Sequence, residues 1–156
     1  MKGMMRMIKT ILVPTDGSDH SEKAVGFAAD LAEKYGAKVH LLHVLRDPGS
    51  ANIPPDLRSY ARIEHVQVTQ REVIREIANE ILEKAEHTAR EHGAKEVESS
   101  IEIGSPAEWI LDAARAREAD LIVMGTRGLG DFQGLIMGST AHKVTHLAPC
   151  TCITVR

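Results

Sequence analysis

A glycine-rich stretch has the residue types and spacing best suited to chemistry. Residues 125–140 read GTRGLGDFQGLIMGST and hold five glycines between an apolar run and a predicted helix. Glycine lets a ligand approach the backbone closely, and consecutive amides can form a nest for an anion. The helix would begin at Ser139 and Thr140, whose hydroxyls can cap it or bond a phosphate oxygen. The stretch therefore predicts a phosphate site, the alternative being a loop that only turns the chain.

Neither of the two common nucleotide fingerprints is present. A Walker A loop requires lysine directly after its last glycine, and none follows Gly138. The dinucleotide fingerprint requires G-x-G-x-x-G after the first strand, and the run from Gly128 to Gly134 has one residue too many.

Two histidines and two cysteines near the C-terminus are a second candidate set. His142 and His146 lie one helical turn apart, and Cys150 and Cys152 follow, all residue types that bind zinc. Both cysteines begin a predicted buried strand, however, and no C-x-x-C pair exists, which favours small buried hydrophobes. A Ser-His-Asp hydrolase is disfavoured because the sequence lacks a G-x-S-x-G elbow.

Asp16 follows the first predicted strand and precedes Gly17 and Ser18. An aspartate there often only forms a turn by bonding its own backbone. Its position at the carboxyl end of a strand favours a ligand-binding role instead. Both interpretations stay open.

Alternating strands and helices must position these groups. Apolar periodicity predicts helices after Ser18, at 66–92, after a capping box at Ser105, and at 141–147. Strands are expected at 7–13, 37–44, 95–103 (at a sheet edge), 121–124 and 151–155. This order predicts an α/β, doubly wound, mostly parallel sheet with helices on both faces. Ligands then bind beyond the strand ends at 14–16, 43–46 and 124–128.

Two segments lie between the second and third expected strands. The expected helix at 66–92 carries one apolar stripe: Val73, Ile74, Ile77, Ile81, Ala85 and Ala89. Residues 46–64 contain three prolines and no clear period, so they are expected to form a long loop, with a lid as one interpretation.

Composition narrows the class of protein. The 156 residues suit one domain spanning 1–156, and a net charge of -3 argues against a general nucleic-acid binder. No apolar run is long enough for a membrane helix. Two cysteines separated by one residue suit a reducing compartment, so a cytoplasmic protein is expected.

The sequence resembles the universal stress protein family over nearly its whole length. Gly125-x-x-Gly128, nine residues and Gly138-Ser139 are similar to that family's nucleotide-binding signature. Four further segments resemble the family in the same order: ILVPTDGS at 11–18, LLHV at 41–44, DLIVMG at 120–125 and HLAPC at 146–150.

The resemblance implies the ATP-binding branch of the family and a five-stranded, Rossmann-like sheet of order 3-2-1-4-5. It implies ATP, ADP or AMP as ligand, with Mg²⁺ or Mn²⁺ bound through the phosphates and no residue assigned as a metal ligand. Pro14, Asp16 and Val44 would line the adenine and ribose. The implied cofactor-binding residues are Pro14, Thr15, Asp16, Val44, Met124, Gly125, Arg127, Gly128, Gly138, Ser139 and Thr140.

The function implied is that of a nucleotide-dependent regulatory or binding module in stress response, dimerising through the strand at 151–155. No activated base is apparent, so no catalytic residue is expected, and hydrolysis would be slow at most. One alternative is an adenylating or pyrophosphate-releasing enzyme, because residues 15–21 faintly resemble its S-G-G-x-D-S loop without the paired glycines. The other is a dimeric interaction protein with a vestigial site.

Overall fold

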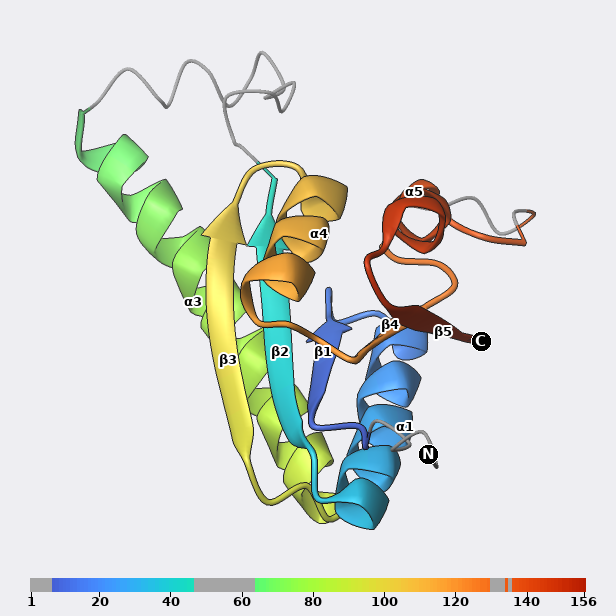
Figure 1. Ribbon diagram of the computed structural model, residues 1–156. Helices are drawn as coiled ribbons and strands as arrows, with labels where there is room; N and C mark the ends of the chain where they lie inside the picture. The colour runs from blue at the N-terminus through green and yellow to red at the C-terminus, as the bar shows by residue number, and fades with distance from the viewer. Residues whose placement is uncertain (1–6, 47–63, 130–133, 135) are drawn as a thin grey trace, which may run out of the picture.

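Five parallel strands form one sheet in the described part of the chain, in the order β3-β2-β1-β4-β5 (Figure 1). The computed structural model describes residues 7–46, 64–129, 134 and 136–156. The strands are β1 (Thr10–Pro14), β2 (Lys38–Leu45), β3 (Val97–Ile103), β4 (Leu121–Gly125) and β5 (Thr151–Val155). The predicted fold class, strand order and edge position of β3 are confirmed.

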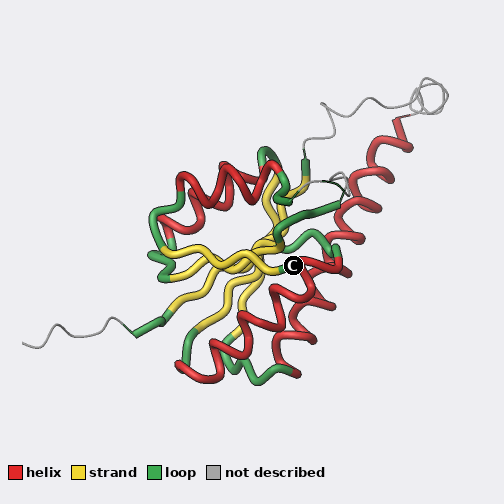
Figure 2. Tube along the Cα trace, turned by 90° about the vertical axis from the view of Figure 1, so that its right-hand side faces the viewer, coloured by secondary structure: helices red, strands yellow, loops and turns green. Residues whose placement is uncertain are grey.

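Helices cover both faces of this sheet, as a parallel sheet requires (Figure 2). Helices α1 (Asp19–Tyr35) and α3 (Glu64–Glu91) pack on one face, and α4 (Pro106–Ala116) and α5 (Ser139–Leu147) on the other. Successive residues of β1 point to opposite faces, so Ile11 and Val13 join one core while Leu12 joins the other.

Local signals set the limits of α1. The Ser18 hydroxyl accepts a hydrogen bond from the amide of Ser21 at 3.3 Å, which makes Ser18 the N-cap. Gly36 ends the helix with φ of 67°, in the left-handed region that glycine adopts without strain. Both features follow the sequence prediction, and the N-cap at Ser18 begins the helix two residues after Asp16.

Two local predictions were wrong. Ser105 is the N-cap of α4 and Pro106 its first residue, as predicted, but the capping box does not form: the Ser105 side chain makes no capping bond, and Glu108 lies 4.0 Å from Lys143 of α5. The stripe on α3 is also shifted, because the N-terminal part of this helix extends past the strand ends (Figure 1). Val73 and Ile77 are therefore about half exposed, and the buried residues are Ala78, Leu82, Ala85 and Ala89. The predicted loop lies, apart from its end residues, outside the described residues.

Candidate functional site

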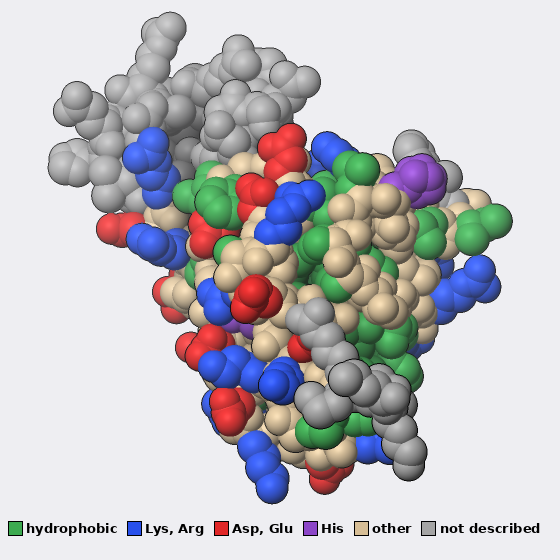
Figure 3. Space-filling model, in the orientation of Figure 1, with side chains coloured by type: hydrophobic (Ala, Val, Ile, Leu, Met, Phe, Trp, Pro, Cys, Tyr) green, Lys and Arg blue, Asp and Glu red, His purple; other side chains and the backbone are tan. Residues whose placement is uncertain are grey.

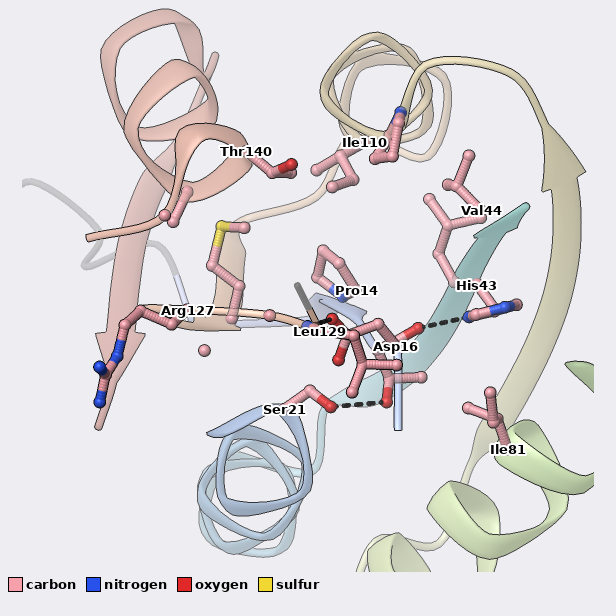
Figure 4. A pocket seen from close by; sticks show the side chains of 18 of the residues that line it. Pro14, Asp16, Ser21, His43, Val44, Ile81, Ile110, Arg127, Leu129 and Thr140 are labelled. Carbon is pink, nitrogen blue, oxygen red and sulfur yellow. Dashed lines mark hydrogen bonds between the residues drawn. The ribbon is translucent and has the colours of Figure 1, made fainter. Parts of the chain in front are cut away.

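The carboxyl ends of β1, β2 and β4 open into a cavity of about 370 Å³ (Figure 4). Strand β1 pairs with β2 on one side and with β4 on the other, so the chain reverses its direction of winding here. Doubly wound sheets bind ligands at this switch point, because the connections leave in opposite directions and a crevice stays open between them.

Ten of the eleven residues that the sequence predicted for a cofactor line this cavity. The exception is Ser139, whose exposed side chain is not part of the lining. The ten are Pro14, Thr15, Asp16, Val44, Met124, Gly125, Arg127, Gly128, Gly138 and Thr140. The structure thus brings together residues separated by more than a hundred positions in the chain.

Apolar side chains from two helices form walls that the sequence analysis missed. Ile77 and Ile81 of α3 and Ile110 of α4 line the cavity together with Met124 of β4. Flat apolar ligands suit such walls, because ligand sites combine mostly apolar surface with a few placed polar groups. No sequence signal distinguishes these isoleucines from core residues, since each sits in an ordinary amphipathic helix pattern.

Asp16 is held by two backbone amides from different segments. Its Oδ1 accepts from the Ser18 amide at 2.9 Å, and its Oδ2 accepts from the Leu129 amide at 2.8 Å. Burial raises the pKa of Asp16, but hydrogen bonds from Ser18 and Leu129 outweigh it, so the pKa lies below its usual value. Asp16 therefore forms the turn and also presents an ionised carboxylate in the cavity lining.

The start of α5 lies across the cavity from this carboxylate (Figure 4). Gly138 is the N-cap and has no side chain with which to cap the helix, and the first turn, Ser139–His142, holds no acidic residue. The Gly138 amide donates to the Thr126 carbonyl at 2.6 Å, which fixes the helix start to the end of β4. Thr140 points toward the cavity from the first turn (Figure 4). An uncapped helix N-terminus attracts anions.

Gly125 is required by packing against α1. A Cβ at this position would lie 2.8 Å from the Cβ of His20 and 2.9 Å from the His20 carbonyl carbon. Only glycine allows the first turn of α1 to approach the end of β4 so closely. The glycine at position 130 of the same stretch lies outside the described residues.

Arg127 lines the cavity with its stem, while its guanidinium points away from the centre (Figure 4). One of its terminal nitrogens lies 3.3 Å from Nε2 of His20, a residue of α1 that the sequence analysis did not single out. Nδ1 of His43, which is buried in β2, lies 2.7 Å from the Thr15 carbonyl oxygen at the cavity wall.

The histidine and cysteine set does not form a metal centre in the described residues, where no three His, Cys, Asp or Glu side chains converge. The ring centroids of His142 and His146 lie 4.7 Å apart, and the ring planes are tilted by 39°. Burial raises the pKa of Cys150 and of Cys152, which keeps both thiols protonated near neutral pH. No helix within the described ranges is long and apolar enough to cross a membrane.

Comparisons with known proteins agree with this architecture. A model of the universal stress protein family matches residues 7–156. A universal stress protein of Thermus aquaticus is 36% identical over 154 residues, covering 96% of this chain and all of that protein.

Solved structures are similar over the same length. The structure of universal stress protein UspA from Lactobacillus plantarum has a TM-score of 0.79 and 29% identity, covering 96% of this chain and 98% of that one. The universal stress protein from Archaeoglobus fulgidus in complex with dAMP has a TM-score of 0.66 and 25% identity, covering 96% and 99%.

Proposed function

Because this chain belongs to the universal stress protein family, we propose that it binds an adenine nucleotide in the strand-end cavity. The observation that carries the proposal is the convergence of ten predicted ligand residues at the switch point of the sheet, beside an uncapped helix start. The dAMP complex of the Archaeoglobus fulgidus protein supports the choice of adenine.

The base and ribose would occupy the side of the cavity near β1 and β2. Pro14 and Val44 line this side with Ile81, and apolar surface of this kind stabilises a purine ring. The ionised Asp16 carboxylate can accept a hydrogen bond from a ribose hydroxyl. Met124 and Gly125 would lie beneath the nucleotide, at the end of β4.

The phosphates would lie over the start of α5. The amides of Ser139 and Thr140 begin this helix, and by helix geometry the first amides have no acceptor inside it. Gly128, Gly138 and the Thr140 hydroxyl complete this side, and Arg127 would supply a positive charge. Asp16 is the sole carboxylate among the described lining residues, so a Mg²⁺ or Mn²⁺ ion would be held mainly by the phosphates.

We propose that the bound nucleotide, ATP or alternatively ADP or AMP, regulates this protein as a binding module in stress response. Both oxygens of Asp16 accept backbone amides, and Nδ1 of His43 is within hydrogen-bond distance of a carbonyl oxygen, which supports slow hydrolysis at most. Strand β5 lies at the edge of the sheet and offers a pairing surface for a homodimer.

Calorimetric titration of ATP, ADP and AMP tests the proposal. Asp16→Ala is expected to weaken binding at least several-fold, since it removes a charged acceptor worth roughly 1.5–3 kcal/mol. Asp16→Asn keeps an oxygen for the Ser18 turn, so a similar loss without a lower melting temperature assigns the effect to the ligand contact. Asp19→Ala is the matched control, because Asp19 is exposed in the first turn of α1.

Two outcomes contradict the proposal: no adenine nucleotide binds the wild-type protein, or Asp16→Ala binds as tightly as wild type. If the wild-type protein binds a nucleotide, mass spectrometry of small molecules extracted from natively purified protein identifies which one it carries.

A further inference from the structure

Three side chains connect the cavity with the end of the edge strand β5. The Thr126 hydroxyl donates to the Val155 carbonyl at 3.3 Å, and Nδ1 of His20 lies 3.0 Å from the same hydroxyl oxygen. Nε2 of His20 lies 3.3 Å from a terminal nitrogen of Arg127. A series of hydrogen bonds therefore runs from Val155 of β5 through Thr126, directly after β4, and His20 of α1 to Arg127 in the glycine-rich stretch.

The chemistry of the two ends determines the direction of every hydrogen bond between them. A carbonyl oxygen only accepts, so the Thr126 hydroxyl hydrogen is committed to Val155. The Thr126 oxygen must then accept from Nδ1 of His20, which therefore carries the hydrogen. In a neutral imidazole the other nitrogen is an acceptor, so Nε2 accepts from Arg127, which only donates.

This arrangement holds Arg127 away from the place where phosphates would bind. The guanidinium is turned from the centre of the cavity (Figure 4), and His20 is not a lining residue. Thr126 is buried and is joined to Val155 by its amide as well as its hydroxyl, so the base of the series is rigid. The Cβ and backbone of His20 pack on Gly125, which fixes the point from which the ring extends.

We propose that His20 is a positioning residue that holds the Arg127 guanidinium withdrawn and yields it to the phosphate chain of a bound nucleotide. The inference rests on the proposed function and adds its regulation. Phosphate oxygens compete with the Nε2 atom of His20 for the guanidinium, and they prevail over this contact because an ion pair is stronger than a bond to an uncharged nitrogen. Only a ligand that carries phosphates draws the Arg127 guanidinium away from His20, and breaking this contact costs free energy. His20 therefore lowers the affinity for ATP relative to adenosine.

Substitutions at His20 separate its two hydrogen bonds. His20→Ala removes both, and His20→Asn keeps a donor near the Nδ1 position but loses the acceptor for Arg127. His20→Gln places an amide oxygen near the Nε2 position and restores that acceptor. Calorimetry with ATP and adenosine then compares each variant with wild type, alone and with Arg127→Ala.

The alanine and asparagine variants are expected to bind ATP about five-fold more tightly, the net contribution of one typical hydrogen bond, with adenosine affinity unchanged. The glutamine variant should behave as wild type. In the Arg127→Ala background, substitution of His20 should have no effect on ATP. Melting temperatures check that the comparison is between folded proteins.

Several results would overturn the inference while leaving the proposed function in place. They are an unchanged or weaker ATP affinity of His20→Ala, an equal change for adenosine, or an effect that persists without Arg127. A ligand-free measurement is also decisive: long-range ¹⁵N–¹H spectra of wild-type protein should show His20 with its hydrogen on Nδ1, and the Nε2-protonated form would contradict the series. If wild type binds neither ligand, the proposed function itself fails and the inference falls with it.

Discussion

Strand β2 carries two buried histidines whose surroundings differ. His43 lies at the cavity, where its Nδ1 is 2.7 Å from the Thr15 carbonyl oxygen. His40 lies three residues earlier, on the opposite face, and its Nε2 is 2.8 Å from the Ser100 hydroxyl of β3. Nδ1 of His40 has no hydrogen-bond partner in the described structure and lies 3.8 Å from a carboxylate oxygen of Glu98.

Side chains around the edge strand β3 form what we call the β3-edge cluster: His40, Ser100, Glu98, Lys38 and Arg117. Lys38 lies 3.1 Å and Arg117 3.4 Å from Glu98, and both pairs are partly exposed. Acidic and basic side chains are interspersed on the face of the molecule seen in Figure 3. Exposed pairs of this kind contribute little free energy each.

The two regions teach different lessons about buried polar groups. At the cavity, main-chain groups hold the polar side chains, and a ligand can use what remains. In the β3-edge cluster, side chains bond to other side chains, and Nδ1 of the buried His40 has no hydrogen-bond partner among the described residues. Substitutions at the cavity should therefore change ligand affinity, and those in the cluster should change stability and its pH dependence.

The substitution with the largest expected effect is at a cavity residue and should change stability, contrary to the general division between the two regions. Gly125 lines the cavity, yet a Cβ there would press on backbone atoms of α1. Gly125→Val is expected to lower the free energy of unfolding by about 3 kcal/mol, the upper end for overpacking in a rigid site. Chemical denaturation measures this loss. Gly134→Ala is the matched control, because a Cβ there meets nothing within 4 Å; equal stability of both variants would show that packing does not require Gly125.

The second largest effect is the pH dependence of stability that His40 confers, which should leave ligand binding unchanged. Burial, with Arg117 nearby, lowers the pKa of His40 to about 4 from its usual 6.5. The unfolded chain therefore takes up a proton at higher pH than the folded chain, and stability falls as the pH decreases from 6.5 toward 4. The loss should reach roughly 2 kcal/mol over this range in wild type.

His40→Gln keeps a partner for Ser100 without titrating, so denaturation curves should show a shallower pH dependence between 6.5 and 4.5. That window separates His40 from Glu98 and Asp16. Their pKa values are lowered, so the stability they contribute is lost only below their unfolded values of 4.5 and 3.8. Parallel curves for the variant and wild type would show that His40 does not carry the effect, and nucleotide affinity at pH 7 should be the same for both.

Features set by neighbours in the chain could be predicted from the sequence. The order of strands and helices, the N-cap at Ser18 and the glycine at 36 depend on local pattern and on the right-handed crossover. The strand ends that form the cavity followed from the same rule.

Features that depend on distant packing could not be predicted. Which face of α3 is buried depends on how far the helix extends past the sheet, so Ile77 was placed in a buried stripe although it lies at the cavity. The glycine at 125 matched a ligand motif, but no sequence pattern shows that His20 packs on it from more than a hundred residues away. The contact between His20 and Arg127 was missed for the same reason.

The smallest expected effect is a difference in ATP affinity between substitutions at two adjacent residues of α5. Ser139 and Thr140 both begin α5, but only Thr140 lines the cavity, and the Ser139 side chain is exposed. Thr140→Ala should weaken ATP binding about five-fold through loss of one hydroxyl contact, whereas Ser139→Ala should stay within about two-fold, because its amide remains. Calorimetry of both variants beside adenosine separates phosphate contacts from general damage. If Ser139→Ala is instead the weaker binder, the phosphates approach the helix from its exposed side, and the cavity holds only the nucleoside.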